Sequence, residues 1–276
     1  MLIADLHCHS TASDGLWPAE QVAQRAIDNG VELLALTDHD TLDGLSSARG
    51  VVEQAGARFI NGVEISIEWG GLQVHIVGLN FADDDAALNA GLAQIRSHRV
   101  ERAQRMSAEL EKVGIPDSFA GAMRHARNPD LISRAHFARY LVEIGVCKDV
   151  RSVFDAYIVP GRPGYVEHRW ATLAESVGWI TQAGGVAVIA HPGRYKFSKS
   201  EMHQLLEAFK ALGGQAIEVI SGSHSLENVT TFGRLATEFG FLASSGSDFH
   251  GPGESYVGLG KTAPLPAQLT PVWEAF

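Results

Sequence analysis

Two histidines near the start of the chain, His7 and His9, stand two residues apart directly after the apolar run Leu2–Leu6. On extended backbone such residues point to the same side, so both imidazoles can reach one metal ion. The pair by itself also occurs by chance. The same spacing returns as a carboxylate and an imidazole in Asp248 and His250, after another apolar run. Ligand chemistry at two separate strand ends therefore predicts a site for divalent cations.

Two further histidines also follow apolar runs. His39 stands between Asp38 and Asp40 at the end of one run, and His191 comes directly after another. Taken singly, the first segment is also typical of a solvated turn, and His191 of a core histidine. Because burial of unpaired titratable groups at a strand exit is costly, the Asp-His-Asp segment still favours a functional site.

Glu64 and His75 lie inside apolar runs, where a titratable side chain needs a partner. A carboxylate that bridges two cations, and an imidazole bound to one of them, would satisfy both groups. Mixed histidine and carboxylate ligands suit Mn²⁺, Zn²⁺ or Fe²⁺, whereas oxygen ligands alone suit Mg²⁺ or Ca²⁺. We therefore expect a transition-metal site and favour Mn²⁺.

The elements that must position these residues are strands that alternate with helices. Pro18 opens a predicted helix with apolar residues at helical spacing, and Asn29 with Gly30 closes it. Such alternation predicts parallel strands with helices outside, in a barrel or an open doubly wound sheet. In a barrel, functional groups gather at the carboxyl ends of the strands. The strand-like runs are Leu2–Leu6, Leu33–Thr37, Phe59–Ser66, Leu72–Leu79, Val186–Ala190, Ala216–Ser221 and Phe241–Ser244.

The alternation of strands and helices is interrupted between residues 99 and 168. The pattern predicts one long charged helix over Ile95–Lys112 and another over Ile132–Gly145. We therefore expect residues 1–98 and 169–276 to form the barrel, and residues 99–168 to form a small helical insertion or cap.

Composition sets limits on the class of protein. With 276 residues, of which 45% are apolar, the chain can bury the core of one α/β barrel with an insertion. Its net charge of −10 argues against a broad basic face for duplex nucleic acid. Its two cysteines are far apart, so a disulfide framework is not expected. Since no apolar run reaches the roughly 20 residues of a membrane span and the first residues lack a basic segment, we expect a cytoplasmic protein without a membrane partner.

Four short motifs resemble those of the polymerase and histidinol phosphatase (PHP) family. They are Asp5-Leu-His-Cys-His-Ser, Thr37-Asp-His-Asp, Ala190-His-Pro and Ser247-Asp-Phe-His, and they occur in the family's order. The resemblance extends over residues 2 to 251. It implies a distorted (β/α)7 barrel and a site for three divalent ions, for which we favour Mn²⁺ over Zn²⁺ or Fe²⁺.

The resemblance also implies a ligand set, with Glu64 as the bridge between two ions. Asp14 departs from the pattern, since many relatives have histidine there, and it would make the second ion's site richer in oxygen. Among the ligands we expect Glu64, Asp248 and His191 to be catalytic. The first ion would take His7, His9, Glu64 and Asp248, the second Asp14, His39 and His250, and the third Glu64, His75 and His191.

Within the family, the chain is most similar to the stand-alone bacterial branch. That likeness implies a phosphomonoesterase that removes the 3′-phosphate of nucleoside 3′,5′-bisphosphates, such as adenosine 3′,5′-bisphosphate, through a metal-bridging hydroxide. Short 5′-phosphorylated single-stranded RNA would be a further substrate. The alternatives are a histidinol-phosphate phosphatase and, from another class, a non-catalytic metal-binding scaffold.

Three side chains are expected to bind the substrate's phosphates: Arg134, His136 and Arg194. Arg134 and His136 open a predicted helix, where backbone N–H groups and a guanidinium can bind phosphate, although an ordinary exposed helix start fits them as well. Arg194 follows His191 by three residues and is expected at the mouth of the site. Weaker candidates for the site are Lys196, His168 and His224, and the candidates for a general acid are Asp40 and His224.

Overall fold

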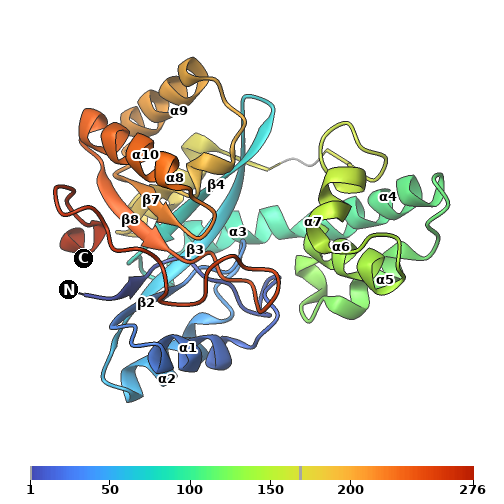
Figure 1. Ribbon diagram of the computed structural model, residues 1–276, viewed down its shortest axis with the longest axis horizontal. Helices are drawn as coiled ribbons and strands as arrows, with labels where there is room; N and C mark the ends of the chain where they lie inside the picture. Colours follow the sequence, from blue (N-terminus) through green and yellow to red (C-terminus); the bar gives the residue numbers. More distant parts are fainter. Residues whose placement is uncertain (1, 168–169) are drawn as a thin grey trace.

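The computed structural model describes residues 2–167 and 170–276, which form a distorted (β/α)7 barrel with a helical lobe beside it (Figure 1). The sheet runs in the order β1-β2-β3-β4-β6-β7-β8, and a hydrogen bond from Leu6 N to Ser245 O brings β8 back to β1. The expected fold and all seven strand-like runs are confirmed. The strands are β1 (Ala4–Asp5), β2 (Leu33–Leu36), β3 (Arg58–Trp69), β4 (Leu72–Leu79), β6 (Val186–Ile189), β7 (Ala216–Ser221) and β8 (Leu242–Gly246).

Strand β4 runs against its neighbours, contrary to the expectation of parallel strands. It pairs antiparallel with β3 on one side and with β6 on the other. The turn from β3 to β4 consists of Gly70 and Gly71, both with positive φ, which suits a two-residue hairpin and leaves no room for a crossover helix. A further short strand, β5 (Ala171–Thr172), pairs with β3 outside the main order.

Helices surround the barrel and continue into the lobe. The helix expected after Pro18 is confirmed as α1. The single helix expected over Ile95–Lys112 is wrong, because the helix is interrupted at His98, where α3 ends and α4 begins. The helices are α1 (Ala19–Asp28), α2 (Leu45–Gln54), α3 (Ala86–Ser97), α4 (Arg99–Glu111), α5 (Ser118–His125), α6 (Arg134–Glu143), α7 (Val150–Val153), α8 (Leu173–Gln182), α9 (Lys199–Ala211) and α10 (Leu226–Phe239).

The inside of the barrel has an apolar layer and a polar layer. Alternate strand residues, such as Leu33 and Ala35, pack on one another and on Val272 near the carboxyl terminus. Because side chains on a strand alternate with a period of two, the face that carries Val77 and Leu79 on β4 also carries His75. The polar side chains of the strands therefore meet above a packed apolar floor.

The lobe has a core of its own. Apolar side chains of α4, α5 and α6, including Met106, Leu110 and Phe137, pack together there. Figure 1 shows this lobe to one side of the barrel, reached through α3 and α4. The domain division between residues 168 and 169 stays a prediction, because both residues lie outside the described part of the chain.

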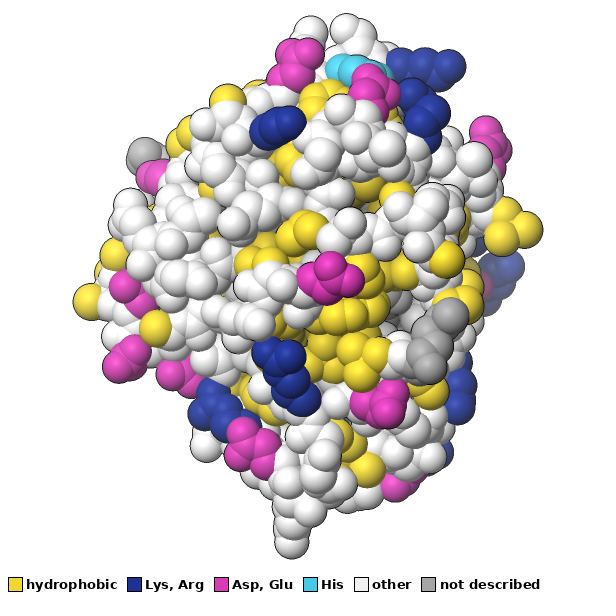
Figure 2. Space-filling view, turned by 90° about the vertical axis from the view of Figure 1, so that its left-hand side faces the viewer, with side chains coloured by type: hydrophobic (Ala, Val, Ile, Leu, Met, Phe, Trp, Pro, Cys, Tyr) yellow, Lys and Arg dark blue, Asp and Glu magenta, His cyan; other side chains and the backbone are white. Residues whose placement is uncertain are grey.

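The face of the molecule that carries the two chain ends lies away from the lobe. Apolar side chains form a band on it, interrupted by single charged residues (Figure 2). Leu2, Ile3 and Trp273 line a shallow pocket near the chain ends. In the described residues, no helix combines the length and the apolar character needed to cross a bilayer.

Candidate metal centre

Glu64 stands at the centre of a ring of histidines. Its Oε1 lies 2.8 Å from Nδ1 of His75 and 2.9 Å from Nε2 of His191. This carboxylate, on β3, is buried and only 1% exposed. The other carboxylate oxygen of Glu64, Oε2, lies 3.2 Å from a ring nitrogen of each of three further histidines, His7, His9 and His39. Five imidazoles around one carboxylate suit a group that bridges two cations.

The other predicted ligands complete the same cluster. Asp248 Oδ1 lies 3.4 Å from Nε2 of His9 and 3.5 Å from Nδ1 of His250. Asp14 Oδ1 lies 3.6 Å from Nε2 of His250. All nine expected ligands thus lie in one cluster, although they come from separate strands and loops. Four overlapping groups have ligand atoms within 4.8 Å of one another: His9, Asp14, His39 and His250; His7, His9 and Asp248; His7, Glu64 and His191; His39, Glu64 and His75.

Hydrogen bonds that continue beyond the strands hold these ends in register. Asp248 N donates to His7 O at 2.7 Å, and Glu64 N donates to Asp38 O at 3.2 Å. Gly246 is needed beside His7, because a Cβ atom on it would lie only 2.2 Å from the His7 Cβ. The close approach of β8 to β1 therefore depends on a residue without a side chain.

Two acidic residues of the motifs hold loops instead of facing the cluster. The Asp5 carboxylate accepts hydrogen bonds from Ser247 N and Gly260 N, both at 2.8 Å. The Asp38 carboxylate accepts from Ser10 N at 2.7 Å and from the Ser13 hydroxyl at 2.6 Å. These bonds fix the loops that carry the ligands after β1 and β8.

The unpaired atoms of the cluster fit bound cations. Oδ1 of Asp248, Oε2 of Glu64 and Nδ1 of His39 are buried without a hydrogen-bond partner among the described residues. Buried acceptors without donors are costly, and cations would satisfy them. The donor set of imidazoles and carboxylates is the one that transition metals prefer.

Charge within the cluster couples metal binding to protons. Burial disfavours the charged imidazolium of His9, but Asp248 and Glu64 outweigh it and raise the pKa of His9 to about 10. Burial also disfavours ionisation of Glu64, yet His75, His39 and His7 hold the pKa of this carboxyl well below its usual value. A ligand imidazole must lose its proton to bind a cation, so loading this site releases protons and weakens as the pH falls.

Glu218 on β7 is a residue that the sequence reasoning missed. Its Oε1 lies 2.6 Å from Nδ1 of His7, and its Oε2 accepts a hydrogen bond from His191 N at 2.5 Å. A carboxylate behind a ligand imidazole fixes the tautomer and orientation of the ring. The signal was present in the sequence, because Glu218 interrupts the apolar run Ala216–Ser221 as Glu64 interrupts its own.

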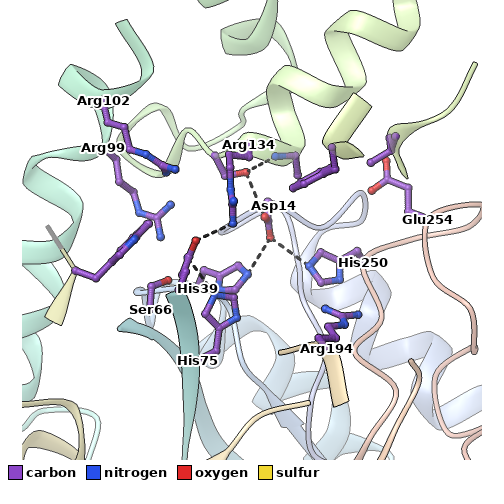
Figure 3. A pocket seen from close by; sticks show the side chains of 16 residues that line it. Asp14, His39, Ser66, His75, Arg99, Arg102, Arg134, Arg194, His250 and Glu254 are labelled. Atoms are coloured by element: carbon purple, nitrogen blue, oxygen red, sulfur yellow. Dashed lines mark hydrogen bonds and ion pairs between the residues drawn. The ribbon is translucent and has the colours of Figure 1, made fainter. Parts of the chain in front are cut away.

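A cavity of about 280 Å³ lies between the cluster and the helical lobe (Figure 3). His39, His75 and His250 line it from the barrel. Arg134 and Arg194, two of the predicted phosphate-binding residues, also line it. Arg194 forms an ion pair with Asp248 through Nη2, and its Nε donates to the Ser223 hydroxyl at 3.1 Å. Further lining residues that the sequence reasoning missed are Ser66, Gln73, Arg99, Arg102, Phe154, Trp170 and Glu254.

His136 does not line the cavity. Its Nδ1 accepts a hydrogen bond from Ser133 N at 3.0 Å and so completes a capping box at the start of α6. Burial lowers the pKa of His136 to about 4, so the ring is neutral at pH 7. The structure therefore gives His136 the position of a helix cap.

The weaker candidates also lie away from the cavity wall. Asp40 is buried, accepts hydrogen bonds from Ser66, and forms an ion pair with Arg99. Both ring nitrogens of His224 are engaged, by Gly193 N and by Val219 O. Lys196 is exposed outside the lining. His168 lies outside the described residues.

Known proteins share the fold of this chain. The model of the PHP domain family matches residues 5–221. The chain belongs to the PHP domain family. The resemblance inferred from the motifs is thus confirmed. This PHP barrel contains the antiparallel strand β4, whereas the sequence pattern alone predicted parallel strands.

Several relatives share nearly the whole length of this PHP chain. A 3′,5′-nucleoside bisphosphate phosphatase of Chromobacterium violaceum is 51% identical, over 98% of this chain and 94% of its own. A 5′-3′ exoribonuclease of Haemophilus influenzae is 40% identical, over 99% of this chain and 98% of its own. A solved amidohydrolase of Chromobacterium violaceum, with bound sulfate and no metal, matches with a TM-score of 0.96 at 51% identity, over 98% of this chain and 94% of its own.

Proposed function

We propose that this PHP chain is a metal-dependent phosphomonoesterase that removes the 3′-phosphate of nucleoside 3′,5′-bisphosphates, such as adenosine 3′,5′-bisphosphate. The observation that carries the proposal is the convergence of nine metal-ligand side chains on one side of a cavity that arginines line on another. The extent of similarity to the bisphosphate phosphatase supports the substrate. Short 5′-phosphorylated single-stranded RNA is the proposed second substrate, in line with the exoribonuclease relatives.

The proposed cofactors are three divalent ions, with Mn²⁺ favoured over Zn²⁺ or Fe²⁺. The shared atoms of Glu64 support a bridging role, since each of its oxygens faces at least two imidazoles. The four overlapping ligand groups support several neighbouring ions. His9 belongs to two of these groups, and we propose that it binds the first ion.

The chemistry follows from the ligands and from the charge around the cavity. Bound divalent ions supply Lewis acidity and activate water for attack on phosphorus, so no serine or cysteine nucleophile is needed. Glu64, Asp248 and His191 would hold the ions, and Arg194 and Arg134 would bind the phosphate groups of the substrate. This local positive charge lets an acidic chain bind an anionic substrate. We also propose a cytoplasmic location and a capping role for residues 99–168.

A substrate comparison tests the function. The Mn²⁺-loaded protein would be assayed for phosphate release from adenosine 3′,5′-bisphosphate and from histidinol phosphate, and for nucleotide release from short 5′-phosphorylated RNA. We expect the highest kcat/KM on the bisphosphate. Preference for histidinol phosphate would overturn the proposal. If the protein turned over none of the three substrates, the alternative of a non-catalytic metal-binding scaffold would be favoured.

Arg194→Ala is expected to raise KM for the bisphosphate about 10-fold and to leave kcat within about 3-fold, because a phosphate contact made equally in the ground and transition states mainly affects KM. Steady-state kinetics with a check of bound metal would measure this. Lys196→Ala removes an exposed charge two residues away and is the matched control. An unchanged KM in Arg194→Ala would remove this residue from substrate binding.

Asp14→His is expected to shift the metal preference of the second site from Mn²⁺ towards Zn²⁺, because an imidazole is a softer ligand than a carboxylate. The protein would be dialysed against equal concentrations of both ions, and its bound metals measured by elemental analysis. Asp43→His, at an exposed position outside the cluster, is the control. The same ratio of zinc to manganese in Asp14→His and in wild type would contradict Asp14 as a ligand.

A further inference from the structure

Three arginines of the helical lobe line the cavity opposite the metal ligands. Arg99 and Arg102 lie one turn apart on α4, and Arg134 is the first residue of α6. Figure 3 shows them on the lobe side, whereas His39, His75 and His250 lie on the barrel side. All three arginines line the same cavity as Asp14 and the histidines.

The positive charge of two of these arginines has no anionic partner among the described residues. Arg99 pairs with Asp40, but no described carboxylate lies within ion-pair distance of Arg102 or Arg134. Arg102 donates through Nε to Val166 O at 3.0 Å, and Arg134 donates to Gln73 Oε1 at 2.7 Å. Both of these acceptors are neutral. A buried cation without an anionic partner is costly, so the position of Arg102 favours the binding of an anion.

Two details of the cavity-lining arginines Arg99 and Arg102 fit an anion bound in the cavity. The side chain of Arg99 is 4% exposed, and its Nε has no hydrogen-bond partner among the described residues. Arg102 is equally buried, at 4% exposed. Burial, with Arg134 and Arg99 nearby, lowers the pKa of Arg102 to about 9, which still leaves the guanidinium charged at pH 7.

Aromatic rings hold the guanidiniums in position. Arg99 and Arg102 each place their Cζ 5.2 Å from the ring centroid of Trp170, and Arg134 lies 5.6 Å from that of Phe154. Both rings also line the cavity. Guanidiniums that are already ordered lose little entropy when they bind a phosphate by two parallel hydrogen bonds.

A short hydrogen-bonded chain joins these arginines to the metal cluster. Gln73 accepts from Arg134 through Oε1, and its Nε2 lies 3.1 Å from Nε2 of the predicted ligand His75. The side chain of Gln73 thus lies between the Arg134 guanidinium and the predicted ligand His75. One small molecule with two anionic groups can therefore contact the arginines and the metal centre at once.

We propose that Arg99, Arg102 and Arg134 form a second phosphate subsite, which takes the 5′-phosphate of a nucleotide whose 3′-phosphate lies at the metal centre. The inference rests on the proposed function and adds to it the residues that distinguish a 3′,5′-bisphosphate from a 3′-monophosphate. The same subsite would select RNA with a 5′-phosphate over RNA with a 5′-hydroxyl.

The test compares two substrates on two variants. In Arg102→Gln, kcat/KM for adenosine 3′,5′-bisphosphate is expected to fall roughly 10- to 100-fold, mostly through KM, because a charge-assisted hydrogen bond to the 5′-phosphate is lost. For adenosine 3′-monophosphate, kcat/KM is expected to stay within about 3-fold. Arg105→Gln, which changes an exposed arginine on the same helix, is the matched control and leaves both values unchanged.

A fall of the same size on both substrates, or no fall on the bisphosphate, overturns the subsite. Thermal melting and metal content, measured on each variant, show that the fold and the metal centre are intact. If Arg102→Gln does not fold, Arg134→Gln replaces it with the same expected result.

Calorimetry separates this subsite from the proposed reaction. Binding of adenosine 5′-monophosphate to the metal-loaded protein is expected to weaken at least about 10-fold in Arg102→Gln, by loss of the same charge-assisted bond. If the wild-type protein hydrolyses neither substrate but binds this ligand through Arg102, the reaction is wrong and the subsite stands. Equal binding by wild type and Arg102→Gln overturns the subsite.

Discussion

Glu64→Gln is expected to lower kcat/KM by about 10³-fold or more and to reduce bound metal by two ions per chain. The substitution keeps the shape of the side chain but removes the charge to which five imidazoles point. Each ion lost takes with it several kcal/mol of transition-state stabilisation, and 1.36 kcal/mol corresponds to a factor of about ten in rate. Kinetics and elemental analysis of the same preparation would measure both effects.

The control for this variant is Glu68→Gln, which changes an exposed glutamate four residues along the same strand. It is expected to keep wild-type turnover and metal content. Near-normal turnover of Glu64→Gln with all ions still bound would refute the bridging role. Loss of turnover with unchanged metal content would make Glu64 important for the reaction but not for holding the ions.

Glu218→Gln is expected to weaken metal binding about 10- to 100-fold, the usual cost of losing a carboxylate behind a ligand histidine. Glu218 contacts the His7 ring and the His191 backbone, so its charge positions two ligands without touching the proposed substrate cavity. Titration of the metal-free protein in the presence of a competing chelator would give the affinity. Activity is expected to return largely at high metal concentration.

Recovery at high metal concentration distinguishes a positioning role from general damage to the fold. Glu227→Gln, at an exposed position on α10, is the control and should bind metal as the wild type does. Wild-type metal affinity in Glu218→Gln would contradict the positioning role. A loss of activity that no metal concentration restores would assign Glu218 a direct part in the reaction.

Sequence patterns did not predict some parts of the fold. The direction of β4 depends on how the Gly70-Gly71 turn closes, whereas the apolar run itself fits either direction. The break between α3 and α4 at His98 lies inside a continuous helical pattern. The pairing of β5 with β3 joins segments about a hundred residues apart. This last feature depends on partners that are distant in sequence.

By itself, the sequence determined the candidate metal ligands and the barrel that brings them together. His7 follows an apolar run directly, and His39 and Asp248 follow theirs within a few residues. Since parallel strands place their carboxyl ends on one side of a barrel, a local pattern is enough to group these residues. Only the tertiary structure decided how the helical lobe meets the barrel. In the sequence, Arg102 on α4 is one of several charged residues of a helix. In the structure, it lines the cavity and is buried without a carboxylate partner among the described residues.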